Sequence, residues 1–395
     1  MEELNQLIKL IDKHKRSNPY LGYLNISIGN NLHEPLIKYV QSFGKKVLFC
    51  TGNTAMRNLG FIKKYNALFN KYKFDVHHYD NIFPNPTLKQ MQEGIFFAKK
   101  IKPDFIFALG GGSVIDTAKA ISVGMYGNVW DFVEKKANIH HSIPIVASST
   151  TSGTGSQVTP YAVITNTDTL EKKTLKHPLL IPKLSIADVS ITRFAPKYIV
   201  ATTGFDVLCH AVEVYTREDC SETAEEFAKN ALMLVRKHLV RSYNNKGVKH
   251  KLGMIYADFY AGIALALVGT HAPHAIAHPI SARFPLINHG QALAYIMADT
   301  IQTQKEKKND ALNKKFIKIS QLLGGNGDIV KTIRNYTKSL ELNRKLADFS
   351  AHDAELVIKD TLGYRRESIR KSPVNLSEED IASIVYNSLL TSKNG

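Results

Sequence analysis

Residues 103–120 read PDFIFALGGGSVIDTAKA, and this stretch decides the fold class. The apolar run at 105–109 is typical of a strand that is buried on both faces of a sheet. Glycines occupy positions 110–112, and the apolar residues after them recur at helical spacing: Val114, Ile115, Ala118 and Ala120. The sequence therefore predicts a strand that passes through a tight turn directly into a helix.

Three more apolar runs have the length of strands. They are KKVLFCTG at 45–52, FDVHHYDNI at 74–82 and HSIPIVASSTTSGTGS at 141–156. The stretches between them are long enough for helices, so right-handed crossovers and a parallel sheet are expected. The first half of the chain is therefore predicted to be an α/β domain with a Rossmann-like sheet, an architecture that binds dinucleotides.

The second half of the chain has a different character. After about residue 190 the strand-like runs stop and long helical segments follow, for example at 221–240 and 254–269. A chain of 395 residues has room for two domains. We expect an α/β dinucleotide-binding domain at 1–190 and an all-helical domain, which binds metal and carries catalysis, at 191–395.

Two glycine-rich loops follow predicted strands. Gly111 and Gly112 would let the backbone approach a pyrophosphate closely, while the helix N-terminus offers free N–H groups and Ser113 a hydroxyl. The second loop, STTSGTGSQVTP at 149–160, is rich in hydroxyl groups. Each loop taken alone also fits an ordinary turn without a ligand. Because both follow parallel strands, we expect them to meet at one edge of the sheet and to form a dinucleotide site.

Asp206, His210, His274 and His289 form a candidate metal site. Asp206 and His210 are four residues apart, so on a helix both side chains leave from one face. His274 and His278 repeat this spacing in PHAIAHP, and His289 follows in NHG. One carboxylate with imidazoles and no thiolate suits Fe(II) or Zn(II).

Such an ion would act as a Lewis acid on the oxygen of an alcohol or a carbonyl compound. Combined with a dinucleotide, this chemistry gives hydride transfer between the nicotinamide and the adjacent carbon. His278, one turn after His274, is expected to carry the proton instead of binding the metal. The alternative for His278 is a core histidine that is hydrogen-bonded to the backbone, and His271 receives no assignment.

These residues, in this order, resemble the iron-containing, or group III, alcohol dehydrogenase family. The resemblance extends over essentially the whole chain and rests on the following motifs: FPNPT (83–87), GGGSVIDTAKA (110–120), STTSGTGSQVTPYAVIT (149–165), the Pro182 to Asp188 spacing, TGFDVLCHAVE (203–213), PHAIAHP (273–279) and NHGQALA (288–294). It implies an NAD(P)-dependent oxidoreductase with an iron site, a cleft between an N-terminal α/β domain and a helical domain, and a homodimer.

The resemblance also implies roles for individual residues. The metal ligands would be Asp206, His210, His274 and His289, with His278 beside the nicotinamide. Besides the pyrophosphate loop of Gly111, Gly112 and Ser113, the residues that match cofactor contacts are Thr150, Thr151, Thr159 and Lys172.

The chain departs from the pattern of this family at three places. Ser149 stands where the family usually has proline, and Gln157 where it has glutamate, which affects the packing of the loop but removes no metal ligand. NAD-using relatives carry an aspartate after the first strand, where this chain reads Thr51-Gly52-Asn53. Because an acidic residue there repels a 2′-phosphate, Gly52 and Asn53 predict that NADP is used slightly in preference to NAD.

Composition narrows the possible partners and the compartment. The 51 Lys and Arg against 35 Asp and Glu give a net charge of +16, but the basic residues are dispersed and no nucleic-acid-binding motif accompanies them. We expect no nucleic-acid partner and no membrane partner, since no apolar stretch approaches about 20 residues. The three scattered cysteines predict reduced thiols, which fits a cytoplasmic protein.

Other functions remain open at this point. The substrate is expected to be a small alcohol or aldehyde, and the alternative is a hydroxy acid or an aldehyde bearing a carboxylate or phosphonate. Arg283, six residues before His289, is a candidate anchor for such an anion. The remaining alternatives are a lyase similar to dehydroquinate synthase and a non-catalytic module that binds metal or nucleotide.

Overall fold

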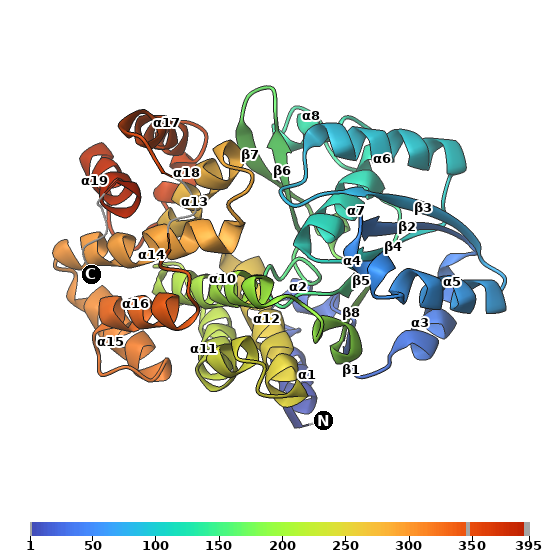
Figure 1. Cartoon of the computed structure of the whole chain (residues 1–395), viewed down its shortest axis with the longest axis horizontal. Helices are drawn as coiled ribbons and strands as arrows, with labels where there is room; N and C mark the ends of the chain where they lie inside the picture. The colour runs from blue at the N-terminus through green and yellow to red at the C-terminus, as the bar shows by residue number, and fades with distance from the viewer. Residues whose placement is uncertain (1, 345–347, 391–395) are drawn as a thin grey trace. The chain divides into compact units, whose positions relative to one another are not determined.

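The computed structural model describes residues 2–344 and 348–390. The chain divides into two compact units, residues 1–195 and 196–395, which are described separately below. Figure 1 shows strands in the first unit and long helices in the second.

The first unit is built on a six-stranded parallel sheet in the order β1-β8-β5-β4-β2-β3. The strands are β1 (Ile26–Gly29), β2 (Lys46–Gly52), β3 (Asp75–Ile82), β4 (Phe105–Gly110), β5 (Ile145–Ser149) and β8 (Leu184–Asp188). A separate antiparallel hairpin consists of β6 (Tyr161–Asn166) and β7 (Glu171–Lys176). The chain runs outward from β2 to β3 and then returns to β4 on the other side of β2. The direction of winding therefore reverses between β2 and β4, and ligands bind at such a position in sheets of this kind.

Helices cover both faces of this sheet (Figure 1). The principal ones are α3 (His33–Val40), α5 (Phe61–Lys71), α6 (Leu88–Ile101) and α7 (Gly112–Gly124). The unit also contains α1 (Glu2–His14) and the short helices α2 (Pro19–Gly22), α4 (Ala55–Asn58), α8 (Val129–Val133) and α9 (Val189–Thr192). Alternate residues of the strands feed two cores. Leu48 and Ile106 pack with α6 and α7, whereas Phe49 and Phe107 pack with α3 and α5. Burial on both faces explains why these strands are almost continuously apolar.

The predicted strands are found at β2, β3, β4 and β5, and the predicted α/β class is confirmed. Sequence analysis missed four strands, namely β1, β8 and the β6–β7 hairpin. The hairpin strand β7 reads EKKTLK and is not an apolar run, because only Lys172 and Leu175 of its six residues are buried. At β8 the apolar run is interrupted by the buried Ser185, which donates its hydroxyl hydrogen to the Gln157 carbonyl.

The second unit contains helices and no strand among the residues that the structure describes. These helices are α10 (Lys197–Thr216), α11 (Glu222–Tyr243), α12 (Val248–Val268), α13 (Ala272–Arg283), α14 (His289–Glu306), α15 (Asp310–Leu322), α16 (Ile329–Ser339), α17 (Ala351–Leu362), α18 (Arg366–Ile369) and α19 (Glu378–Leu389). The two helical segments expected at 221–240 and 254–269 correspond to α11 and α12, and each helix begins or ends a few residues away from the expected position.

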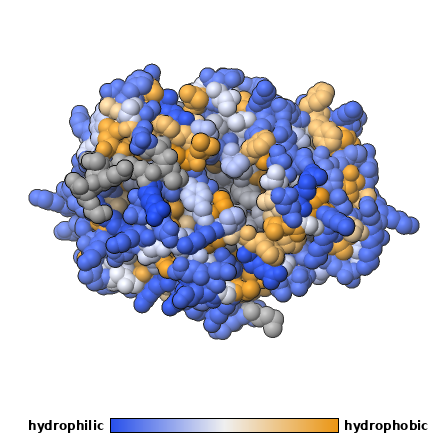
Figure 2. Space-filling view, in the orientation of Figure 1, coloured by the Kyte–Doolittle hydropathy of each residue, from blue (hydrophilic) through white to orange (hydrophobic). Residues whose placement is uncertain are grey.

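Helix α12 corrects one expectation about membranes. Its 21 residues have the length and composition of a membrane span, with a mean hydropathy of 1.4, although the sequence was expected to contain no such stretch. In the structure 78% of its most apolar 18-residue stretch is buried inside the protein. A core helix has the same composition, so α12 alone is weak support for a membrane segment. Figure 2 shows a face on which hydrophilic residues predominate and hydrophobic ones form small groups.

A buried lysine fixes the second glycine-rich loop. Lys119 on α7 is fully buried, and its ammonium group donates to three carbonyl oxygens: Ser156 (2.6 Å), Tyr161 (2.7 Å) and Thr159 (2.8 Å). Asp116, one turn earlier on α7, accepts hydrogen bonds from the Ser156 hydroxyl and from the Val163 N–H. Burial lowers the pKa of Lys119 to about 8, although the charge of Asp116 opposes this shift. The two side chains hold residues 156–163 against α7.

We expect Lys119→Met to lower the free energy of unfolding of the first unit by about 2–4 kcal/mol, because three buried carbonyl groups lose their charged donor. Trp130 is the only tryptophan of the chain and packs in the same core, so its fluorescence during urea denaturation reports on this unit. The exposed Lys100 on α6 provides the matched control. If Lys100→Met and Lys119→Met have equal effects, the clamp does not contribute to stability.

Candidate active site

The two glycine-rich loops lie side by side at the carboxyl edge of the sheet. β4 and β5 are neighbours, with Gly110 paired to Ser149, and the Thr150 N–H donates to the Gly110 carbonyl at 3.0 Å. This contact confirms the expectation that the loops meet at one edge. A Cβ at Gly112 would lie 2.6 Å from the Thr154 methyl group, so glycine is required there for the loops to approach this closely.

The start of α7 has the properties of an anion site. The helix begins at Gly112 after the N-cap residue Gly111, and no side chain of the described residues caps it. The N–H groups of Gly112 and Ser113 precede the first hydrogen bonds of the helix, which Val114 and Ile115 donate to the Gly111 carbonyl. These donors and the positive end of the helix dipole suit a pyrophosphate. The residues present therefore fit the diphosphate of a dinucleotide.

Gly52 is the last residue of β2, the strand next to β4 in the sheet, and Asn53 follows it. A Cβ at Gly52 would lie 3.9 Å from a Val114 methyl group, which places this turn beside the start of α7. Asn53 is exposed. The structure therefore gathers Gly52, Asn53 and the glycines of the first loop at the position where the winding of the sheet reverses.

The other residues that were matched to cofactor contacts are more enclosed. Thr151 follows β5 and lies against Gly111, 3.1 Å from the position of a Cβ there. Thr159 is 2% exposed, and its carbonyl accepts from Lys119. Lys172 on β7 is 4% exposed and donates to the Asn85 side chain at 2.8 Å.

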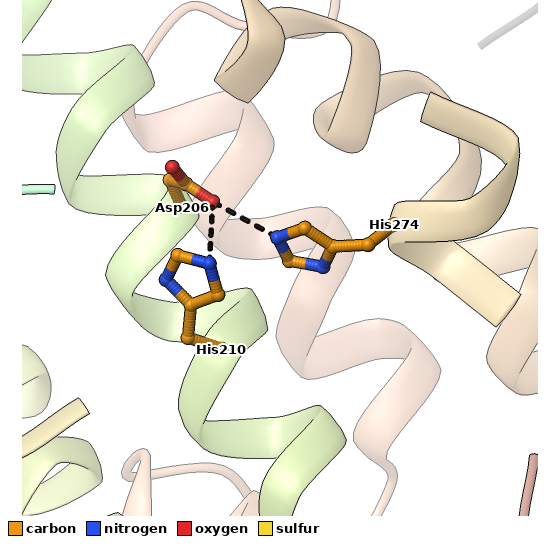
Figure 3. Close-up of side chains that lie close together, drawn as sticks. All are labelled: Asp206, His210 and His274. Carbon is orange, nitrogen blue, oxygen red and sulfur yellow. Dashed lines mark hydrogen bonds and ion pairs between the residues drawn. The ribbon is translucent and has the colours of Figure 1, made fainter. Parts of the chain in front are cut away.

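Asp206, His210 and His274 form a buried group in the second unit (Figure 3). Asp206 and His210 project from one face of α10, as their spacing requires, and His274 projects toward them from α13. One Asp206 carboxylate oxygen lies 3.3 Å from Nε2 of His274 and 3.5 Å from Nε2 of His210. One donor atom from each residue fits within 4.8 Å of the others.

These distances fit a single metal ion. Ligand atoms that bind one ion tetrahedrally at about 2.0–2.2 Å lie about 3.3–3.6 Å apart. Two separations in the group, 3.3 and 3.5 Å, fall in this range. Carboxylate oxygen and imidazole nitrogen are donors that both Fe(II) and Zn(II) accept. The three residues therefore suit a divalent ion in position as well as in chemical type.

His289 and His278 lie beside this group. The His289 ring centroid is 5.2 Å from that of His274 and 5.0 Å from that of His278. His289 is the first residue of α14, which Asn288 caps with its side chain. His278 stands one turn after His274 on α13, with ring centroids 6.4 Å apart. The structure thus brings all five predicted residues of this cluster together, with His289 and His278 outside the compact group of three.

Glu213 was not recognised from the sequence. It is fully buried on α10, and one carboxylate oxygen bonds to Nδ1 of His274 while the other accepts the His271 N–H at 2.8 Å. This bond orients the ring of His274 so that Nε2, the nitrogen that would bind a metal ion, faces Asp206. The spacing in the sequence could have indicated Glu213, because it follows Asp206 by seven residues and so lies on the same face of α10.

His271 has a structural role. Besides the bond from its backbone to Glu213, its Nε2 lies 3.0 Å from the Thr216 hydroxyl. Burial lowers the pKa of His271 to about 4, so its ring is neutral at physiological pH.

The charges within the buried group attract one another strongly. Burial would raise the pKa of Asp206, but His210, His274 and His289 outweigh it and lower this pKa to about 2. Burial would likewise lower the pKa of His274, yet Glu213 and Asp206 raise it to about 9. A site that favours a proton between two carboxylates also favours a divalent cation in the same position.

One of the departures from the family pattern has a local structural explanation. The Ser149 hydroxyl donates to the Thr151 carbonyl at 2.7 Å, a bond that proline could not make. Gln157 is fully buried, and its backbone carbonyl accepts from Ser185, but nothing in the structure explains glutamine in place of glutamate. Both residues hold the second loop and neither lies in the unit that contains the metal-site residues.

Arg283 does not offer a free charge to a substrate. It is the last residue of α13, and its Nε donates to the Asp360 carboxylate at 2.7 Å. The pair is largely enclosed, with side-chain exposures of 16% and 15%. The candidate anion anchor from the sequence is therefore engaged in an internal ion pair.

A parallel nucleotide-binding sheet in one unit and a buried Asp-His-His group in a helical unit are features of metal-dependent, nicotinamide-using oxidoreductases. Comparison with known proteins narrows this class. The model of the iron-containing alcohol dehydrogenase family matches residues 25–189, and that of the C-terminal part of the Fe-containing alcohol dehydrogenase family matches residues 200–389. The chain belongs to the iron-containing alcohol dehydrogenase family and is an oxidoreductase that acts on CH–OH groups.

Individual relatives agree over most of the chain. Long-chain-alcohol dehydrogenase 1 of Geobacillus thermodenitrificans is 28% identical, over 90% of this chain and 93% of its own. The NADPH-dependent butanol dehydrogenase of Clostridium saccharobutylicum is 28% identical, over 79% and 82%. The crystal structure of an archaeal halo-thermophilic alcohol dehydrogenase from a Red Sea brine pool superposes with a TM-score of 0.88 at 31% identity, over 93% of this chain and 97% of that one.

We expect Glu213→Gln to weaken metal binding by about 10- to 100-fold, because an amide no longer fixes the proton on Nδ1 of His274. The affinity for Zn(II) is measured by competition with a chelator. Glu225→Gln on α11 is the control, since Glu225 pairs with Lys229 on the surface. An unchanged metal affinity in a folded Glu213→Gln protein would show that this bond does not orient the ligand.

Proposed function

We propose that this chain is an NAD(P)-dependent dehydrogenase that interconverts a small alcohol and its aldehyde. The proposed metal ligands are Asp206, His210, His274 and His289, and the proposed ion is Fe(II), with Zn(II) as the alternative. The observation that carries the proposal is the pair of 3.3 and 3.5 Å separations around one oxygen of Asp206, which suit a single ion. When bound, this ion would polarise the oxygen atom of the substrate.

The side chains of the chain provide the rest of the chemistry. Glu213 keeps His274 in the tautomer whose Nε2 is available, and Asp206 supplies a negative charge that stabilises the cation. His278 is proposed to move the proton of the substrate hydroxyl, because its ring adjoins those of His274 and His289 without belonging to the compact group. The burial of Asp206, Glu213, His274 and His278 limits competing water.

The proposed dinucleotide site consists of the residues at the ends of β2, β4 and β5. The diphosphate would lie at the start of α7, against Gly111, Gly112 and Ser113, and Thr150, Thr151, Thr159 and Lys172 would support the remainder of the cofactor. Gly52 and the exposed Asn53 would face the adenosine ribose. An uncharged residue there leaves room for a 2′-phosphate, and we propose NADP as the slightly preferred cofactor.

The direct test is an anaerobic assay of protein reconstituted with Fe(II) or Zn(II), using a panel of primary alcohols and aldehydes with NAD(H) and NADP(H). Sustained, metal-dependent change of cofactor absorbance with a simple alcohol is expected. If no alcohol or aldehyde supports turnover with either metal, the proposed function is wrong.

We expect Asn53→Asp to lower kcat/KM for NADP by at least about 10-fold and to change that for NAD little, because a carboxylate repels the 2′-phosphate. Asn58→Asp, at the end of α4, is the matched control for an added charge nearby. If kcat/KM falls equally for NADP and NAD, Asn53 does not lie beside the adenosine ribose.

A further inference from the structure

Arg365 is a buried arginine without an internal acceptor. It lies between α17 and α18, is 9% exposed, and its Nε is enclosed without a hydrogen-bond partner. Its side chain makes no hydrogen bond or ion pair with any residue in the described ranges 2–344 and 348–390. The remaining positions of the sequence include no Asp or Glu that could provide a carboxylate.

The other enclosed arginines of this unit are paired. Arg217 is 4% exposed and binds Asp219, and Arg283 binds Asp360 at 2.7 Å. The exposed neighbour Arg366 binds Glu378 at 2.7 Å. Arg365 is therefore an exception among comparable side chains. A guanidinium group is always charged in proteins, and an uncompensated buried charge is costly, so such a group is expected to have an anionic ligand.

Arg365 lies near the predicted metal site within the second unit. α18, which Arg365 precedes directly, packs against α13, the helix that carries His274 and His278 (Figure 1). The charge of Glu213, whose carboxylate bonds to His274, acts on the Arg365 guanidinium without an ion pair between them. The arginine is thus close enough to share the electrostatic environment of the site.

Charge balance points in the same direction. Asp206 and Glu213 together carry two negative charges, which a divalent ion would neutralise, and neutral histidines add none. The charge of Arg365 then has no direct ion-pair partner among the described residues, although Tyr364, Glu213 and Glu367 also act on it at longer range. An anionic group on the substrate would neutralise it, and a guanidinium binds carboxylate, sulfonate or phosphonate oxygens in bidentate fashion.

We propose that Arg365 determines specificity by binding the anionic group of a substrate whose other end carries the reacting alcohol or aldehyde. This inference rests on the proposed dehydrogenase function and specifies its substrate class. The competing explanation is that Arg365 only balances the charge of Glu213, in which case its loss would affect the metal site and all substrates equally.

The test compares two aldehydes of equal length, n-butanal and 4-oxobutanoate, which differ by one carboxylate. The metal-reconstituted wild-type protein is expected to reduce 4-oxobutanoate with the higher kcat/KM. Arg365→Gln should lower that value by about 10- to 100-fold, mainly through KM, and change the value for butanal by less than about 3-fold. Arg365→Lys, which keeps the charge, should restore part of the loss, and Arg366→Gln is the matched control.

A second measurement does not depend on turnover. Calorimetric titration with butanoate should show weaker binding to Arg365→Gln than to wild type, with equal metal content and unfolding midpoint in both proteins. 3-Oxopropanesulfonate and 3-oxopropylphosphonate, assayed in the same way, identify which anion is preferred. Loss of metal, or an equal loss for butanal and 4-oxobutanoate, overturns the proposal in favour of charge balance. Absence of turnover with both aldehydes in the wild type rejects the proposed function instead, and unchanged butanoate binding in Arg365→Gln rejects the anion site alone.

Discussion

The bond between Glu213 and Nδ1 of His274 is the interaction on which the metal-site geometry depends. It joins α10 to α13 within the core of the helical unit and determines which nitrogen of His274 faces Asp206. Because Asp206, His210 and Glu213 all lie on α10, one helix supplies two of the proposed metal ligands and the carboxylate that orients His274, the proposed ligand on α13. Rotation of α10 about its axis would misplace all three residues together, so the packing of this helix and the chemistry of the site are inseparable.

In the α/β unit the corresponding constraint is the close approach between the start of α7 and the second glycine-rich loop. Gly112 brings α7 against the second loop, and Lys119 and Asp116 fix that loop from the other side. A charged lysine is an unusual core residue, and it is tolerated here because carbonyl oxygens take all three of its protons. The motif GGGSVIDTAKA therefore contains both the surface offered to a diphosphate and the internal clamp that holds the neighbouring loop.

Sequence patterns predicted the parallel sheet, the helical second half and the clustering of Asp206, His210, His274, His278 and His289. Periodicity and spacing are local properties, so features that depend on them can be predicted from the sequence. The β6–β7 hairpin was missed because its strands are only partly apolar, and Glu213 was missed because its partner His274 is distant in sequence. Arg283 was only a candidate for anion binding, and its pairing with Asp360 could not be predicted because it depends on how α13 and α17 pack.

The contrast between Arg283 and Arg365 shows what the three-dimensional structure adds. Arg283 has the more suggestive position in the sequence, six residues before His289, but Asp360 neutralises it. Arg365 stands in a segment without a recognisable motif, yet it is buried and its Nε has no hydrogen-bond partner among the described residues. Since a buried guanidinium group without a direct ion pair is unfavourable, the proposed anionic ligand would supply the ion pair that the described residues do not provide. Charge balance, more than position in the sequence, therefore indicates which arginine meets the substrate.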